Sequence, residues 1–247
     1  MIKIKSDREI ELIRQSGKIT ASVLEILGEM IRPGITTAEL DMKAEDYIKE
    51  SGGRPAFKGY NGFPASICTS INEEIVHGIP SKRTLKKGDI ISVDVGVELE
   101  GYFSDAARTY AVGAIDEKSA DLMDATKLAL DRGVDQARQG KRVLDISRAV
   151  QRTAEEKGYS IIRTFVGHGV GSELHEAPEV PNFETPGKNI DLECGMVLAI
   201  EPMISAGREE VFIKEDGWTA VTKDGSRVAH FENTVAITEN GPEVLTL

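Results

Sequence analysis

Four acidic residues lie inside apolar segments of this 247-residue chain, where a charged side chain is costly to bury. Asp94 interrupts DIISVDVGV, Asp105 interrupts YFSDAARTYAV, Glu201 follows MVLAI, and Glu232 lies in a segment rich in Val, Ile and Thr. If one neutral histidine imidazole joins these four carboxylates, the group carries four negative charges, which two divalent cations cancel. Oxygen-rich ligation with one nitrogen favours Mn, Fe, Co or Zn. Two such ions about 3.5–4 Å apart polarise a carbonyl and activate water, so the pattern predicts hydrolytic chemistry.

The two aspartates lie on adjacent β-rich segments, between which a hairpin is expected. If its loop centres on Leu99-Glu100, Asp94 and Asp105 are direct cross-strand partners with Cβ atoms about 5 Å apart. If the loop centres on Glu100-Gly101, they share a face but lie diagonally, and a three-residue loop puts them on opposite faces. Two like charges on one face need neutralisation, which a divalent cation supplies. The alternative is that each aspartate points to water from an edge strand.

Three of the four histidines stand in segments rich in turn residues. His168 lies in GHGVG, His175 follows it in HEAP, and His77 lies in VHGIP. A histidine flanked by glycines on a tight loop can direct its ring at a fixed point, although a single loop histidine is more often structural. The fourth, His230, shares the face of Glu232 if the strand is extended. We expect it to be structural or at the rim of a site, and not a ligand.

Helical and strand patterns follow the same order twice along the chain. In the first half, capping boxes at Ser6 and Thr36 open two helices that end at Pro33-Gly34 and Gly52-Gly53. Strands are expected there over 66–71, 89–97 and 102–112. In the second half, helices are expected over 118–139 and 145–157, and strands over 161–166, 196–203, 218–222 and 228–237, with a hairpin turn at 223–226.

The repeated order predicts an α+β fold built from two similar halves, approximately 1–112 and 113–247. No linker or low-complexity tract separates these halves. We therefore expect one fused domain over 1–247.

Composition excludes several classes of protein. Asp and Glu number 41 and Lys and Arg number 30, so the net charge of −11 makes the chain a poor nucleic-acid binder. Cys68 and Cys194 cannot form a disulfide scaffold, which fits a reducing compartment. The first residues lack an apolar signal core, and no apolar run approaches the roughly 20 residues that span a bilayer. A cytoplasmic protein with no membrane role is expected, as a monomer by default.

Several segments carry a specific resemblance: YNGFPASIC at 60–68, SINEEIVHGIP at 70–80, DIISVD at 89–94, GHGVG at 167–171, and the pair Glu201-Pro202. With them the chain resembles the methionine aminopeptidase family, in its bacterial-type short form with the pita-bread fold. The resemblance covers essentially the whole chain. Its most specific part is the ordered set of ligand types Asp, Asp, His, Glu, Glu.

The resemblance implies a role for each of these five residues. Asp105 and Glu232 would bridge two divalent ions, whose identity among Co, Mn, Fe and Zn stays open. Asp94 would complete the ligands of one ion, and His168 and Glu201 those of the other. The metal site would then lie between the two halves.

The resemblance also implies the roles of the groups that act on substrate. His77 would hydrogen-bond near the scissile amide nitrogen, and His175 would stabilise the oxyanion of the tetrahedral intermediate. Glu201 would be the acid/base partner of the attacking water. A monovalent cation would bind backbone carbonyls near Asn72, Glu74 and Val228.

An apolar pocket for the methionine side chain is implied as well, with soft or aromatic walls. Its floor would be Cys68 and Trp218, with Tyr60 and Phe63 nearby; ordinary core packing is the alternative for the first two. Two positions at its border depart from the family pattern: Leu174, where many relatives have phenylalanine, and Phe57, where some bacterial relatives have cysteine. Both departures concern selectivity and not the metal site.

The implied function is removal of the initiator methionine from newly made polypeptides with a small second residue, with transient ribosome contact. An X-Pro peptidase on the same fold is one alternative, but such enzymes usually carry a large additional N-terminal domain. A catalytically inactive module that binds peptides is another. The presence of all five ligand types, together with His77 and His175, argues against an inactive module.

Overall fold

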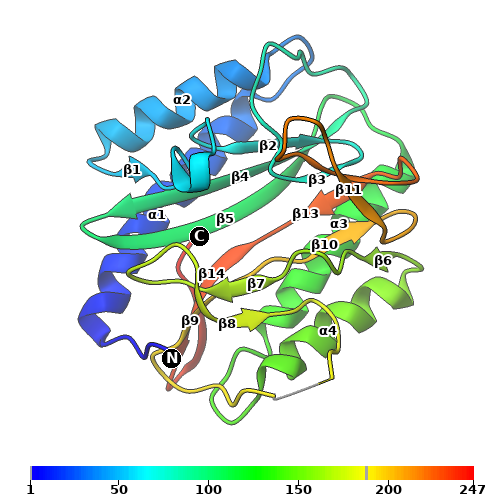
Figure 1. Ribbon diagram of the computed structural model, residues 1–247. Coiled ribbons are helices and arrows are strands. Elements are labelled where there is room, and N and C mark those ends of the chain that lie inside the picture. Colours follow the sequence, from blue (N-terminus) through cyan, green and yellow to red (C-terminus); the bar gives the residue numbers. More distant parts are fainter. Residues whose placement is uncertain (1, 187–188) are drawn as a thin grey trace.

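Strands form a curved layer through the middle of the molecule, and two pairs of helices lie against it (Figure 1). This computed structural model describes residues 2–186 and 189–247. The helices are α1 (Asp7–Met30), α2 (Thr37–Glu50), α3 (Glu117–Val134) and α4 (Val143–Glu156). Helices α1 and α2 pack with each other and α1 contacts β4 and β5, whereas α3 and α4 pack with each other beside strands of the second half. The α+β class is confirmed.

Local sequence signals fix where the helices begin. The Ser6 and Thr36 side chains accept hydrogen bonds from the third backbone N–H of α1 and α2, and both predicted capping boxes are complete. Helix α3 ends at Val134, earlier than predicted, because the backbone then closes a turn in which Gln136 N–H bonds the Gly133 carbonyl.

Strands in the described residues form four sheets. One contains β1 (Arg54–Pro55), β2 (Cys68–Ile71), β4 (Ile90–Leu99) and β5 (Tyr102–Ala111). A second contains β3 (Glu74–Val76), β11 (Val211–Ile213) and β12 (Ala220–Thr222). A third contains β6 (Ser160–Ile161), β10 (Met203–Ser205) and β13 (Val228–His230). The fourth contains β7 (Gly167–Gly169), β8 (Glu176–Val180), β9 (Val197–Ile200), β14 (Asn233–Thr238) and β15 (Gly241–Val244).

The β4–β5 hairpin places both aspartates on one face, diagonally. Leu99 pairs with Tyr102, so Asp94 lies opposite Ala107, and Asp105 lies opposite Gly96. Direct cross-strand pairing of the aspartates is therefore wrong, and the loop centred on Glu100-Gly101 is the correct alternative. Both loop residues have positive φ (52° and 83°), as a two-residue turn that matches the twist of the strands requires.

Two segments predicted as single strands are each divided at a glutamate. The first passes from β9 to β10 through Glu201-Pro202, where proline has no N–H to continue a ladder. The second passes from β13 to β14 through Phe231 and Glu232. In both segments one strand belongs to the five-stranded sheet and the other to the sheet of β6, β10 and β13. Each glutamate thus lies where the chain crosses from one sheet to another.

Two further strand predictions are wrong. Of the segment 161–166, only Ile161 is in a strand (β6), and the rest runs as a loop. The turn at 223–226 does not close a hairpin, because β12 and β13 pair in different sheets. The Asp224 carboxylate accepts hydrogen bonds from Ser226 N–H (3.0 Å) within the turn and from Arg208 N–H (2.8 Å), so it joins the turn to the segment at Arg208.

The two halves of the chain meet along β5. Asp105 N–H donates to Thr234 Oγ1 (2.9 Å), which donates to the Asp105 carbonyl (2.8 Å). Further along, Thr109 Oγ1 donates to the His230 carbonyl (2.8 Å), and Glu232 N–H donates to the Ala107 carbonyl (2.9 Å). These bonds fix the second-half strands against the aspartate hairpin.

None of the helices in the described residues is both long and apolar enough to span a bilayer.

Candidate metal centre

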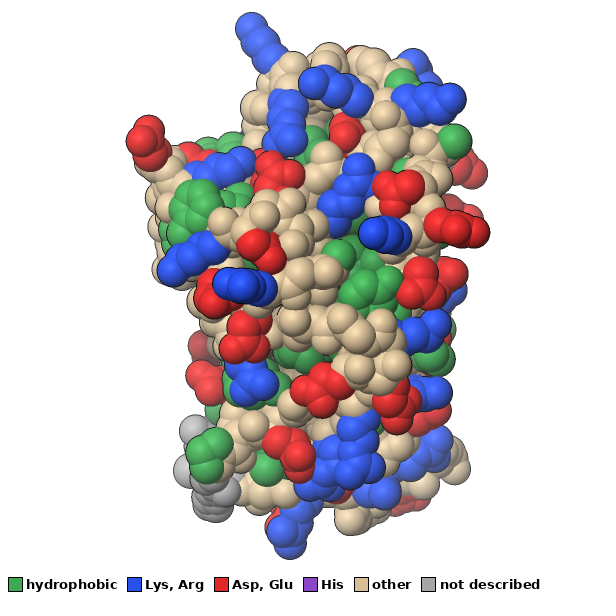
Figure 2. All heavy atoms as spheres, turned by 90° about the vertical axis from the view of Figure 1, so that its right-hand side faces the viewer, with side chains coloured by type: hydrophobic (Ala, Val, Ile, Leu, Met, Phe, Trp, Pro, Cys, Tyr) green, Lys and Arg blue, Asp and Glu red, His purple; other side chains and the backbone are tan. Residues whose placement is uncertain are grey.

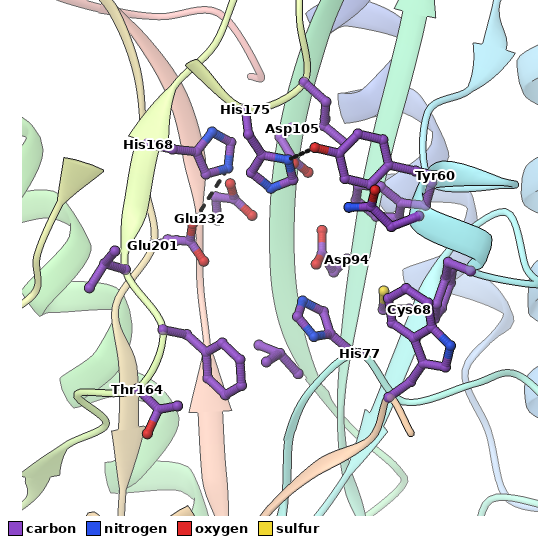
Figure 3. Close-up of a pocket in the computed structure, with 18 residues that line it drawn as sticks. Tyr60, Cys68, His77, Asp94, Asp105, Thr164, His168, His175, Glu201 and Glu232 are labelled. Atoms are coloured by element: carbon purple, nitrogen blue, oxygen red, sulfur yellow. Dashed lines mark hydrogen bonds and ion pairs between the residues drawn. The ribbon is translucent and has the colours of Figure 1, made fainter. Parts of the chain in front are cut away.

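The five residues predicted as ligands all line one cavity of about 450 Å³. Figure 3 shows their side chains directed toward a shared space, with the aspartates on one side and the other three residues opposite. Their positions follow from the fold: Asp94 is on β4, Asp105 on β5, His168 on β7, Glu201 directly after β9, and Glu232 directly before β14. The cavity therefore lies where the two halves of the chain meet.

The carboxylates are buried and incompletely bonded. Asp94 Oδ1, Asp105 Oδ1 and Glu232 Oε1 are buried without a hydrogen-bond partner among the described residues. Burial raises the pKa of Asp94 to about 7. Burial, and then the neighbouring carboxylates, raise the pKa values of Asp105, Glu201 and Glu232 well above their ordinary range. Such a cluster of oxygens suits a cation, which would supply the missing partners.

His168 is oriented as metal-binding histidines usually are. Its Nδ1 lies 2.9 Å from the Gly169 carbonyl oxygen, so Nδ1 carries the donated proton and Nε2 presents its lone pair to the cavity. Burial lowers the pKa of His168 to about 3, which keeps the ring neutral. Ligand atoms of Asp105, His168 and Glu232 all lie within 4.8 Å of one another. The residues present therefore fit a cation centre.

His77 and His175 line the same cavity as these ligands. His77 has a positive φ of 60°, and a Cβ on the following Gly78 would lie 2.1 Å from the Thr69 carbonyl oxygen. The close approach that only glycine allows thus holds the His77 loop against β2. The ring centres of His175 and His168 lie 4.2 Å apart, and His175 Nδ1 is 2.9 Å from the Tyr60 hydroxyl (Figure 3). Burial lowers the pKa of both His77 and His175.

The other end of the cavity is apolar. Phe63, Cys68 and Leu174 belong to one buried cluster with Phe57, and Trp218 packs against it. Phe63 and Trp218 meet edge to face with their ring centres 5.1 Å apart. Burial raises the pKa of the Cys68 thiol well above its ordinary value, so this cysteine offers an apolar wall and not a thiolate. Three of the four residues predicted for a methionine pocket, Phe63, Cys68 and Trp218, are thus gathered in one place, whereas Tyr60 lines the same cavity beside His175.

The description "Metallopeptidase family M24" belongs to the family model that matches residues 11–239 of the chain. A methionine aminopeptidase of Clostridium acetobutylicum is 56% identical, with 100% of this chain and 99% of the relative covered. The chain belongs to the methionine aminopeptidases of family M24.

Other comparisons support the same family assignment for this M24 peptidase. Methionine aminopeptidase 1 of Bacillus subtilis is 50% identical over 100% of this chain and 99% of its own. The crystal structure of a methionine aminopeptidase from Thermotoga maritima superposes with a TM-score of 0.98 at 48% identity, covering 100% and 99% of the two chains. A prolidase from Pyrococcus furiosus has a TM-score of 0.78 at 29% identity, with 99% of this chain and 65% of the prolidase covered. The fold is the pita-bread fold.

Two side chains near the site of this M24 peptidase were not assigned to it from sequence. His230 is 1% exposed, and its Nε2 lies 3.6 Å from Glu201 Oε2. Of the two roles expected for His230, structural or at the rim of a site, its burial contradicts the rim position. Asn182 Nδ2 donates to the Glu201 carbonyl (3.0 Å). For His230, the available sequence signal was its position two residues before Glu232, on the same strand face. For Asn182, no local pattern in the sequence indicates a place near the site.

Proposed function

We propose that the chain removes the N-terminal methionine from polypeptides with a small second residue, using two divalent ions and an attacking water. The observation that carries this proposal is the single cavity with five ligand-type side chains at one end and a thiol-and-aromatic slot at the other. The first end suits hydrolysis at a metal centre and the second suits a thioether side chain. The family membership supports the same assignment.

Asp105 and Glu232 would bridge the two ions. Asp94 would complete the ligand set of one ion, and His168 and Glu201 that of the other. When bound, the ions lower the pKa of water and polarise the scissile carbonyl. Manganese, iron, cobalt and zinc all suit this mixture of oxygens with one nitrogen.

The remaining polar groups act on substrate and protons. Glu201 takes the proton of the attacking water and passes it to the leaving amine, a role that suits a carboxyl whose pKa is raised by burial. His175 donates from Nε2 to the developing oxyanion, since its Nδ1 faces the Tyr60 hydroxyl. His77 hydrogen-bonds near the scissile amide nitrogen and orients the peptide.

The methionine side chain would enter the apolar slot, with Cys68 and Trp218 at its floor and Tyr60 and Phe63 beside it. Leu174 and Phe57 complete the same cluster, so both departures from the family pattern border the slot. A monovalent cation near Asn72, Glu74 and Val228 remains part of the proposal; the Asn72 carbonyl accepts a hydrogen bond from Val228 N–H (2.8 Å), which joins these segments.

We propose that the substrates are new polypeptides in the cytoplasm, met during transient ribosome contact, and that the monomeric chain 1–247 acts as one catalytic domain of two related halves. Basic and acidic side chains are interspersed over the face shown in Figure 2. That mixture suits brief contact with the ribosome better than stable docking.

A peptide-release experiment tests this function. The full chain, loaded with Mn²⁺, Co²⁺ or Fe²⁺, is incubated with Met-Ala-Ser, Met-Leu-Ser and Phe-Pro-Ala, and free amino acids are followed by mass spectrometry. Methionine is expected from Met-Ala-Ser, at a rate at least about tenfold above that from Met-Leu-Ser. Cleavage of Phe-Pro-Ala at a comparable rate would support the X-Pro alternative, and no release with any of the three metals would refute the proposal.

Tyr60→Phe tests how His175 is held. Loss of the hydroxyl that faces His175 Nδ1 is expected to lower kcat for Met-Ala-Ser about three- to tenfold, the value of one lost hydrogen bond, and to leave KM within about twofold. Tyr102→Phe is the matched control, since its hydroxyl donates to Glu9 Oε1 (3.0 Å) on another element. Unchanged kcat in Tyr60→Phe would show that Tyr60 does not orient His175.

A further inference from the structure

His230 is a buried imidazole for which the proposed chemistry has no use. It ends β13, it is 1% exposed, and it is not one of the residues that line the cavity. Its Nε2 has no hydrogen-bond partner among the described residues. A buried polar atom without a partner is destabilising, so the position calls for a functional reason.

The Nε2 atom of His230 faces two of the candidate metal ligands. It lies 3.6 Å from Glu201 Oε2 and 3.9 Å from Glu232 Oε2. These distances leave no room for an intervening water molecule, and they slightly exceed a hydrogen bond. The last torsion of a glutamate side chain has a broad energy profile, so a small rotation of the Glu201 carboxylate brings Oε2 within bonding range.

The two oxygens of Glu201 face different imidazoles. Oε1 lies 3.7 Å from His168 Nε2, whose lone pair points into the cavity. Metal–nitrogen and metal–oxygen bonds are about 2.0–2.2 Å long, so this separation would allow both atoms to bind one ion. His230 Nε2 lies at a similar distance from Oε2, and ligand atoms of Glu201, His230 and Glu232 also lie within 4.8 Å of one another, so distance alone does not distinguish the two imidazoles. His168 lines the cavity whereas His230 does not, so Oε1 would be the oxygen on the metal side and Oε2 remains for His230.

A hydrogen-bond donor beside Glu201 Oε2 would hold that carboxylate in one orientation. A neutral imidazole has one N–H donor and one acceptor nitrogen, and only the donor suits a carboxylate oxygen. Carboxylates that bind metal ions are themselves commonly held by hydrogen bonds, and the loss of such a bond typically weakens metal binding 10- to 100-fold.

We propose that His230 is a positioning residue that donates from Nε2 to Glu201, with Glu232 beside it, and holds both carboxylates in the orientation that binds the ions. The role rests on the metal centre of the proposed function. It differs from ligation, because a donor can be replaced by another donor, whereas a ligand nitrogen cannot be replaced by an amide N–H.

Calorimetric titration of the chelator-treated full chain with Co²⁺ tests this role without measuring activity. His230→Leu, which removes the donor and fills the space, is expected to weaken binding of at least one ion about 10- to 100-fold. His230→Gln, which keeps an N–H donor, is expected to bind both ions within about threefold of the wild type. If His230→Leu does not fold, His230→Met replaces it, since an unbranched side chain adapts to irregular space.

Ser92→Ala is the matched control. Its buried hydroxyl lies 2.9 Å from Thr109 Oγ1, which bonds the His230 backbone, so the variant perturbs the same packing without touching the imidazole. Wild-type affinity in His230→Leu would overturn the positioning role. Equal loss in His230→Leu and His230→Gln would also overturn it, in favour of ligation by the imidazole. Failure of the wild type to bind two ions would refute the metal centre itself, which separates the two proposals.

Discussion

Replacement of Asp105 by asparagine is expected to lower kcat/KM for Met-Ala-Ser by about a thousandfold or more. The substitution preserves the shape of the side chain but removes an anionic oxygen that would bridge both ions, so its effect should exceed the 10- to 100-fold typical of groups that only orient ligands. Steady-state kinetics with each metal present in excess measures the loss. Asp124→Asn, at an exposed position on α3, is the charge-matched control and should keep full activity.

The same variant should become more stable when no metal is bound. Burial and the charge of Asp94 raise the pKa of Asp105, which means that the ionised carboxylate opposes folding. A gain of about 1 kcal/mol corresponds to a rise of about 2–4 °C in Tm for a chain of this size. Loss of activity together with a higher metal-free Tm would exclude misfolding. Activity within tenfold of the wild type would show that Asp105 does not bridge the ions.

Metal removal is expected to make the free energy of unfolding fall as the pH rises from about 6.5 to 7.5, through the folded pKa of Asp94. The folded pKa of Asp94 is raised to about 7, and burial raises those of Asp105, Glu201 and Glu232 well above their ordinary range, whereas unfolded carboxylates titrate near 4. The stability linked to these protonated carboxyls is complete below pH 4 and is lost as the pH rises through the folded pKa values. For each carboxyl that is protonated in the folded chain and ionised in the unfolded chain, the free energy of unfolding falls by about 1.4 kcal/mol per pH unit.

The histidines set the lower limit of this pH window. Burial lowers the pKa values of His77, His168, His175 and His230, so below about pH 6.5 they favour the unfolded chain and oppose the carboxylate effect. Above that pH they are neutral in both states, and the carboxylates alone determine the slope.

Thermal melts at several pH values, with a chelator or with excess Mn²⁺, measure the effect of the ions. Bound ions should raise Tm and remove the fall above pH 6.5, because they replace the lost protons as partners of the carboxylates. Asp105→Asn should reduce the slope in the chelator series. A metal-free stability that stays constant or rises between pH 6.5 and 7.5 would contradict the charge arrangement.

The aspartates show what could be predicted from sequence. Alternation along strands placed Asp94 and Asp105 on a hairpin and left three registers open, because loop length decides which face each residue takes. The register depended on positive φ at Glu100, which is uncommon for a residue other than glycine and therefore hard to predict. The conclusion that the two carboxylates share a face is correct, although their direct pairing is not.

The glutamates and His230 show what could not be predicted. Local pattern marked Glu201 and Glu232 as carboxylates in apolar runs, but the crossing between sheets depends on strand partners far away in the sequence. The burial of His230 depends in the same way on Met203 of β10 and Thr109 of β5, with which it pairs or bonds. The alternation of side chains along a strand predicted correctly that His230 shares a face with Glu232, but it could not predict how deeply His230 is buried.

The crossing of Glu201 and Glu232 between sheets also bears on how the molecule refolds. The ligands come from both halves of the chain and from separate hydrogen-bond ladders, so no half can assemble the centre by itself. Helices such as α1 form from local contacts, which are fast, whereas the ligand set needs contacts between distant parts of the chain, which are slow. A folding intermediate with native helix content but without the contacts between the two halves would therefore be inactive.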